Sequence, residues 1–130
     1  MRKNDGIKQA VIQRIAKGQN WAKAQGVGQE KYDVEGETIH TRYCSPPTYK
    51  FNLNPNTLRS DYELWICGDE SHYYFIPIQY IRQMYNHPEA YPDRHHPEIR
   101  VVSVDRNTHM ATYAKGGKKM DLREYFCSIL

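Results

Sequence analysis

The feature that most constrains the fold is a pair of apolar runs separated by a short polar turn. The first run, Tyr62 to Cys67, contains Glu63 as its only charged residue and is followed by Gly68. A run of this length without polar alternation is typical of a central strand with both faces buried. The second run, Tyr73 to Ile78, begins directly after the turn, so we expect it to form the neighbouring strand. The sequence therefore predicts a sheet built around Tyr62 to Cys67.

Further strands are predicted where β-branched and aromatic residues lie between turn signals. Two of them form a hairpin around Gly36, which Pro46 and Pro47 bring to an end. Two more are joined by a turn that begins at Asp105. In chain order, the predicted strands are Lys31 to Val34, Thr38 to Cys44, Tyr49 to Leu53, Ile99 to Val104 and Met110 to Tyr113.

Three segments have apolar residues at helical spacing. The first, Ile7 to Ala16, carries basic residues on its other face, and a Gly- and Gln-rich segment, Gly18 to Gln29, follows it. The second is Ile78 to Tyr85, and the third is Leu122 to Leu130. Together with the strands, this order predicts an α+β fold with helices packed against a mixed β-sheet.

The length and composition indicate one cytoplasmic domain over residues 1–130. A chain of 130 residues supports a single core of modest size. No stretch approaches the roughly 18 apolar residues of a membrane span, and the charged N-terminus does not resemble a secretory signal. Cys44, Cys67 and Cys127 are widely spaced, which argues against both a disulfide framework and a zinc ribbon.

The segment from Tyr32 to Ile81 resembles the core of the restriction-endonuclease-like superfamily, the PD-(D/E)XK nucleases. In that family, one strand contributes an Asp and the next contributes an acid, any residue and then Lys, with further strands and a helix following. This resemblance covers about 50 residues and implies a restriction-endonuclease-like fold. It also implies a metal-dependent DNA endonuclease that acts as a homodimer.

Carried over to this chain, the resemblance places Asp33 at the metal-binding Asp and His40, Thr41 and Arg42 at the acid-X-Lys triplet. Glu37 would supply a substitute carboxylate from near the turn. The resemblance thus implies Asp33, Glu37, His40 and Arg42 as catalytic residues, with Asp33 and Glu37 holding a divalent metal, magnesium or manganese.

Two departures from the family pattern bear on catalysis. His40 replaces a hard oxygen ligand with a nitrogen, which suits zinc or manganese better than magnesium. Arg42 keeps its charge and serves mainly as a phosphate fork, whereas a Lys can lose its proton and act on water. Asp33 and Glu37 around Gly36 also match an ordinary solvated hairpin tip.

A basic segment near the other end of the chain predicts nucleic-acid binding. Lys115, Lys118 and Lys119 flank two glycines that allow close backbone approach, and Arg94 extends the basic character. The eleven tyrosines add surfaces that stack on bases or bond phosphate, although many belong to the core. The alternative is that the lysines form a solvated turn.

Three hypotheses remain open at this level. The first is a homodimeric, metal-dependent DNA endonuclease, and the second is a DNA-binding module of nuclease-like fold without catalysis. The third is a protein-interaction or accessory subunit of a defence or mobile-element system that uses a tyrosine-rich interface. A metal site at His87, Asp93, His95 and His96 is disfavoured because their spacing is irregular.

Overall fold

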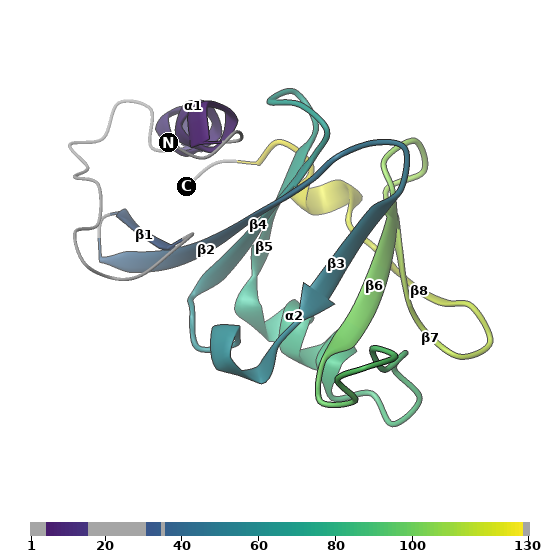
Figure 1. Ribbon diagram of the computed structural model, residues 1–130. Helices are drawn as coiled ribbons and strands as arrows, with labels where there is room; N and C mark the ends of the chain where they lie inside the picture. The colour runs from purple at the N-terminus through teal and green to yellow at the C-terminus, as the bar shows by residue number, and fades with distance from the viewer. Residues whose placement is uncertain (1–4, 16–30, 35, 129–130) are drawn as a thin grey trace.

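The computed structural model describes residues 5–15, 31–34 and 36–128, which form two four-stranded sheets and two α-helices (Figure 1). Sheet A has the strand order β1-β2-β4-β5, and sheet B has the order β3-β6-β7-β8. The strands are β1 (Lys31–Val34), β2 (Glu37–Cys44), β3 (Tyr49–Leu53), β4 (Tyr62–Cys67), β5 (Tyr73–Pro77), β6 (Arg100–Asp105), β7 (Met110–Ala114) and β8 (Lys118–Asp121). The helices are α1 (Asp5–Ile15) and α2 (Ile78–Tyr85), with 3₁₀ turns η1 (Pro55–Thr57) and η2 (Arg123–Tyr125).

Strand β4 lies inside sheet A and is buried on both faces, as the sequence predicts. Leu64 and Ile66 face helix α1 and belong to one apolar cluster, whereas Trp65 and Cys67 face sheet B and belong to another. Because side chains alternate along a strand, a continuous apolar run supplies both faces at once. The predicted neighbour β5 pairs with β4 in antiparallel register.

Sheet B covers the face of sheet A that α1 leaves open. Its inward residues come from a clean alternation in β3, where Tyr49, Phe51 and Leu53 are buried and Lys50 and Asn52 are exposed. Phe51 stacks on Trp65 with ring centroids 4.6 Å apart and an interplanar angle of 6°. Such a pair adds roughly 0.5–1.5 kcal/mol beyond the area that it buries. The layers are therefore α1, sheet A and sheet B, in that order.

The α+β class is confirmed, but the arrangement differs from a single mixed sheet flanked by helices. Sheet A is mixed, because β2 and β4 run parallel, while sheet B is wholly antiparallel. The chain leaves sheet A after β2, at Pro46 and Pro47, which have no N–H groups to continue a ladder, and β3 then joins sheet B. Its one-sided apolar pattern then suits the outer layer of a sandwich.

Two expectations for the last part of the chain are wrong. The lysine segment is not an open loop, because Lys118 and Lys119 belong to strand β8, which pairs with β7. The expected helix from Leu122 onward is only the short turn η2, after which Phe126 adopts an extended conformation. The amide of Cys127 then donates to the carbonyl of Tyr73 at 2.8 Å, so this segment caps the free edge of β5. The apolar side chains of this segment dock on a strand edge instead of forming a helix face.

Gly68, directly after β4, has a backbone conformation and a surrounding that both favour glycine. Its φ is +90°, and a Cβ built there would lie 3.1 Å from Oη of Tyr49 and 3.3 Å from Nη1 of Arg106. Gly116 has a similar φ of +80°, but nothing lies within 4 Å of its Cβ position.

We therefore expect Gly68→Ala to lower the free energy of unfolding more than Gly116→Ala. The left-handed conformation alone costs about 1 kcal/mol for alanine, and the tight contacts at Gly68 add to that cost. Urea unfolding of both variants measures the difference. Equal losses would mean that the Tyr49 and Arg106 side chains move aside freely.

Candidate functional site

The chemistry-bearing residues of this chain converge on a buried carboxylate, that of Glu63 in β4. Its Oε2 accepts a hydrogen bond from Nδ1 of His40 at 2.8 Å, and its Oε1 accepts from Nε1 of Trp65 at 3.0 Å. Nε of Arg42 also reaches Oε1, at 3.3 Å. The Glu63 side chain is only 1% exposed, so these three donors replace the water that an ionised carboxylate requires.

The strand register explains why these residues meet. Strands β2 and β4 run parallel with His40 beside Glu63, and Arg42 follows His40 at the next position on the same face. Arg42 also donates from Nη2 to Oγ1 of Thr57 at 3.3 Å, which connects the cluster to the turn η1. The cluster therefore ties two strands of sheet A to the turn that leads into β4.

His40 and Arg42 differ in how far a ligand can reach them. The His40 side chain is 7% exposed, whereas that of Arg42 is 22% exposed. Because the carboxylate of Glu63 accepts from Nδ1 of His40, that nitrogen carries a proton and the imidazole orientation is fixed. The arrangement can orient a histidine and a guanidinium, but it offers a substrate little access to the histidine.

The proposed metal ligands Asp33 and Glu37 are not brought together. Asp33 is paired with Thr38 across the β1–β2 hairpin, so the two side chains share a face. Glu37 precedes Thr38, and strand alternation directs its side chain to the opposite face. Oδ1 of Asp33 instead accepts from the amide of Gly36 at 3.1 Å, the ordinary role of an aspartate in a turn.

The donor set therefore does not fit a shared divalent metal at Asp33 and Glu37. Over residues 5–15, 31–34 and 36–128, no three His, Cys, Asp or Glu side chains gather as a metal site would need. His40 lies opposite Lys31 in the hairpin register, two positions away from the Asp33–Thr38 pair. The four residues that the family resemblance implies thus separate into His40 and Arg42 at Glu63, and Asp33 and Glu37 at the hairpin tip.

The predicted nucleic-acid residues are all exposed and lie toward one end of sheet B. Lys115 is in the β7–β8 turn with Gly116 and Gly117, whose φ angles are +80° and +71°. Lys118 and Lys119 follow in β8, and Arg94 is in the loop between α2 and β6. Hydrogen bonds from the amide of Lys115 to the carbonyl of Glu89, and from Tyr91 to Tyr113, fasten that loop to β7.

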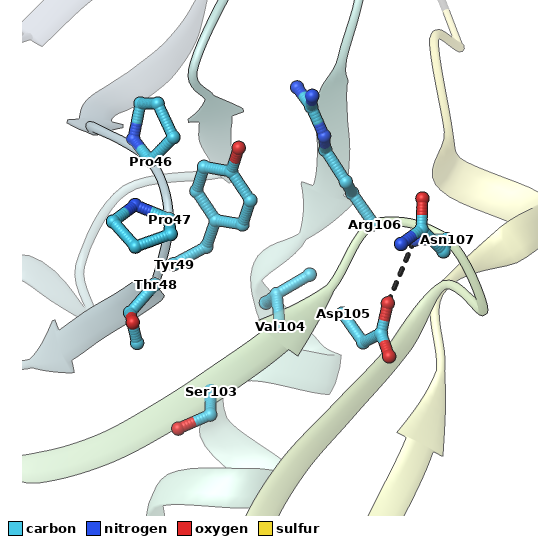
Figure 2. A pocket seen from close by; sticks show the side chains of 9 residues that line it. All are labelled: Pro46, Pro47, Thr48, Tyr49, Ser103, Val104, Asp105, Arg106 and Asn107. Carbon is cyan, nitrogen blue, oxygen red and sulfur yellow. Dashed lines mark hydrogen bonds between the residues drawn. The ribbon is translucent and has the colours of Figure 1, made fainter.

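A groove of about 570 Å³ lies between the β2–β3 loop and the β6–β7 turn (Figure 2). In Figure 2 the Tyr49 ring stands between Pro46 and the Arg106 side chain, and the guanidinium lies 5.3 Å from the ring centroid. Arg106 also donates from Nη1 to the carbonyl of Cys67 at 2.9 Å and to Oδ2 of Asp69 at 3.3 Å. Its cation is thus already engaged within the fold.

The ionisable groups beside this groove have shifted pKa values with clear causes. Burial raises the pKa of the Cys67 thiol to about 12, so it is protonated and unreactive at neutral pH. The hydrogen bond from His72 is the main reason that the pKa of Asp69 lies below its usual range. Neither group provides a nucleophile or a general base for the groove.

The sequence pattern missed the central residue of the cluster, Glu63. The available signal was a single charged residue within a run predicted to be buried on both faces. A buried charge must be paired, so such a residue indicates that cations or N–H donors lie on neighbouring strands. The family resemblance implies His40 and Arg42 as catalytic residues, and not as partners of Glu63.

Comparison of the chain with protein-family models, with curated proteins and with solved structures gives no match. In the described part of the chain, no helix is both long enough and apolar enough to cross a membrane.

We expect Glu63→Ala to lower the free energy of unfolding by about 3–5 kcal/mol, because it leaves buried donors without their shared acceptor. The matched control is Glu70→Ala, which removes an exposed carboxylate 3.5 Å from Arg14. An exposed pair contributes at most about 1 kcal/mol. Urea unfolding of both variants tests the comparison, and similar losses would mean that the Glu63 cluster adds no more than a surface ion pair.

Proposed function

We propose that this protein is a DNA-binding module that contacts the phosphate backbone through the β7–β8 hairpin. Its function is to bind the DNA without metal-catalysed cleavage. The observation that supports the proposal is a group of exposed cations without an acidic partner. Within the described residues, no ion pair or side-chain hydrogen bond involves the group Lys50, Arg94, Lys115, Lys118 and Lys119.

Four arginines of the described residues contrast with this group. Arg14, Arg42, Arg106 and Arg123 each have a carboxylate within 4 Å, and these pairs serve the fold. The net charge of +3 therefore understates how uneven the surface is. Uncompensated cations on one surface repel one another. Binding to a polyanion relieves that repulsion, and the protein's cations displace the counterions of the polyanion.

The hairpin has the access that phosphate contacts need. Glycines at 116 and 117 leave the turn without side chains, so a phosphate can approach the backbone amides as well as the lysines. The neighbouring loop is held in place by Asp93, whose Oδ2 accepts from the amides of His95 and His96 at 3.1 and 3.0 Å. Arg94 lies in this loop, which hydrogen bonds fasten to the end of β7.

One observation supports the endonuclease alternative: His40 and Arg42 converge on a carboxylate. The carboxylate is Glu63, not Asp33 or Glu37; its side chain is 1% exposed, and it already accepts from three donors. A catalytic metal on this carboxylate would also have to contact waters and a substrate phosphate, and the burial of Glu63 leaves little access for them. We therefore favour binding without cleavage and treat nicking as the competing outcome.

The test is a gel-shift titration of a duplex DNA at several salt concentrations. We expect wild-type protein to retard the duplex with a steep negative slope of log Kobs against log salt. Replacing Lys115, Lys118 and Lys119 with Ala should reduce the magnitude of that slope by about 0.9 for each lysine that contacts a phosphate. The mass of the complex also tests the predicted homodimer.

The control is Arg14→Ala. Arg14 lies on α1, outside the hairpin, and its cation is paired with Glu70. It should leave the slope unchanged. An unchanged slope in the lysine variant would remove the hairpin from the interface. Incubation with supercoiled plasmid in magnesium or manganese completes the test, since EDTA-sensitive nicking would restore the endonuclease hypothesis.

A further inference from the structure

The outer face of sheet B, the face turned away from sheet A, carries a row of four polar residues in direct cross-strand register. Lys50 of β3 pairs with Ser103 of β6, Ser103 with Thr112 of β7, and Thr112 with Lys119 of β8. Directly paired residues in antiparallel strands share a face, so all four side chains project to the same side. Val104 and Ala111, the neighbours of Ser103 and Thr112 along β6 and β7, point to the opposite face and are buried. The face that carries the row is therefore the outer one.

This row is open to solvent at both ends. Lys50 and Lys119 are exposed, and Ser103 and Thr112 between them are half-buried. Helix α1 packs on the far face of sheet A, and the buried residues of α2 belong to the core between the sheets (Figure 1). Among the described elements, none of the helices or strands covers the row.

The charge pattern selects an anionic partner. The row contains two cations and two hydroxyls and no carboxylate, and the hydroxyls are ordinary phosphate contacts. The acids of this face, Asp105 and Asp121, both pair with Met110 in the adjacent row toward the β6–β7 turn. These two carboxylates limit the cationic surface near the β6–β7 turn. At the opposite end of the strands, β7 and β8 lead to Lys115 and Lys118.

The spacing of the two lysines suits the two strands of a duplex. Three inter-strand intervals of about 4.8 Å separate them, or roughly 14 Å. The major groove of B-DNA is about 12 Å wide, so lysines at this separation reach phosphates on opposite sides of it.

The aromatic residues argue against a single strand. Single-stranded nucleic acids bind mainly by stacking bases on exposed aromatic side chains. All eleven tyrosines belong to the described residues, and each is buried or half-buried. None of these tyrosines is fully exposed, which favours phosphate contacts over base stacking.

We propose that the outer face of sheet B binds a DNA duplex across a groove, with Lys50 and Lys119 contacting phosphates of the two different strands. This inference rests on the proposed function and adds a surface and a ligand class to it. Lys50 is the informative residue, because it lies two strands away from the β7–β8 hairpin.

The experiment measures fluorescence anisotropy of a labelled 20-base-pair DNA duplex, with the corresponding single strand and an RNA duplex as competing ligands. The variants are Lys50→Ala, Lys115→Ala with Lys118→Ala, and the control Lys31→Ala. Lys31 is another lysine without a partner among the described residues, but it lies on β1 of sheet A. Far-ultraviolet circular dichroism and urea unfolding establish that each variant is folded.

We expect Lys50→Ala to reduce the magnitude of the duplex salt slope by about 0.9, and Lys31→Ala to leave it unchanged. We also expect the single strand to bind at least tenfold more weakly than the duplex. Loss of slope in the hairpin variant without any change in Lys50→Ala would overturn this inference and leave the proposed function intact. Tighter binding of the single strand or of the RNA duplex would also overturn it, and no binding of any nucleic acid would overturn both proposals.

Discussion

The burial of strand β4 on both faces is the constraint on which the rest of the molecule depends. One face of β4 needs an apolar cover and obtains it from α1, through Val11, Ile12 and Ile15. The other face, with Trp65 and Cys67, needs a second cover and obtains it from sheet B. The layered arrangement follows from a single sequence segment, because neither cover alone would remove both sets of side chains from water. The outer face of sheet B remains free for polar residues because the requirement for burial ends at its inner face.

Much of this fold follows from local pattern. The alternation in β3 and the apolar runs of β4 and β5 set those strands correctly, since each pattern reflects which faces are buried. The division into two sheets could not be predicted in the same way, because sheet membership depends on pairing between segments far apart in the chain. The helix predicted from Leu122 onward is wrong for a related reason. Leu122 and Phe126 have helical spacing, but their apolar side chains satisfy contacts to β5 and to the core, and tertiary packing overrides spacing in a short segment.

The candidate site shows a similar limit. His40 and Arg42 were selected because a family pattern placed chemistry at their positions, and the structure joins them through Glu63, which the pattern did not use. Strand parity could have separated Glu37 from His40 in advance, since they are three residues apart on one strand. The partner of a buried carboxylate on a parallel neighbour could not have been found that way, because register across a crossover is not encoded in any local run. The lysines were identified correctly as exposed, yet their alignment with Lys50 required the pairing of four strands.

The docking of Phe126 and Cys127 on the edge of β5 has a consequence for biosynthesis. Roughly 50 residues separate β5 from the segment that caps it, and ribosomes add about 5–20 residues per second. The backbone groups at this edge of β5 are therefore unpaired for roughly 3–10 s after the strand is made. An apolar strand with an open edge can pair with another nascent chain during that interval. Until that segment is made, the edge of β5 is thus open to mispairing with another chain.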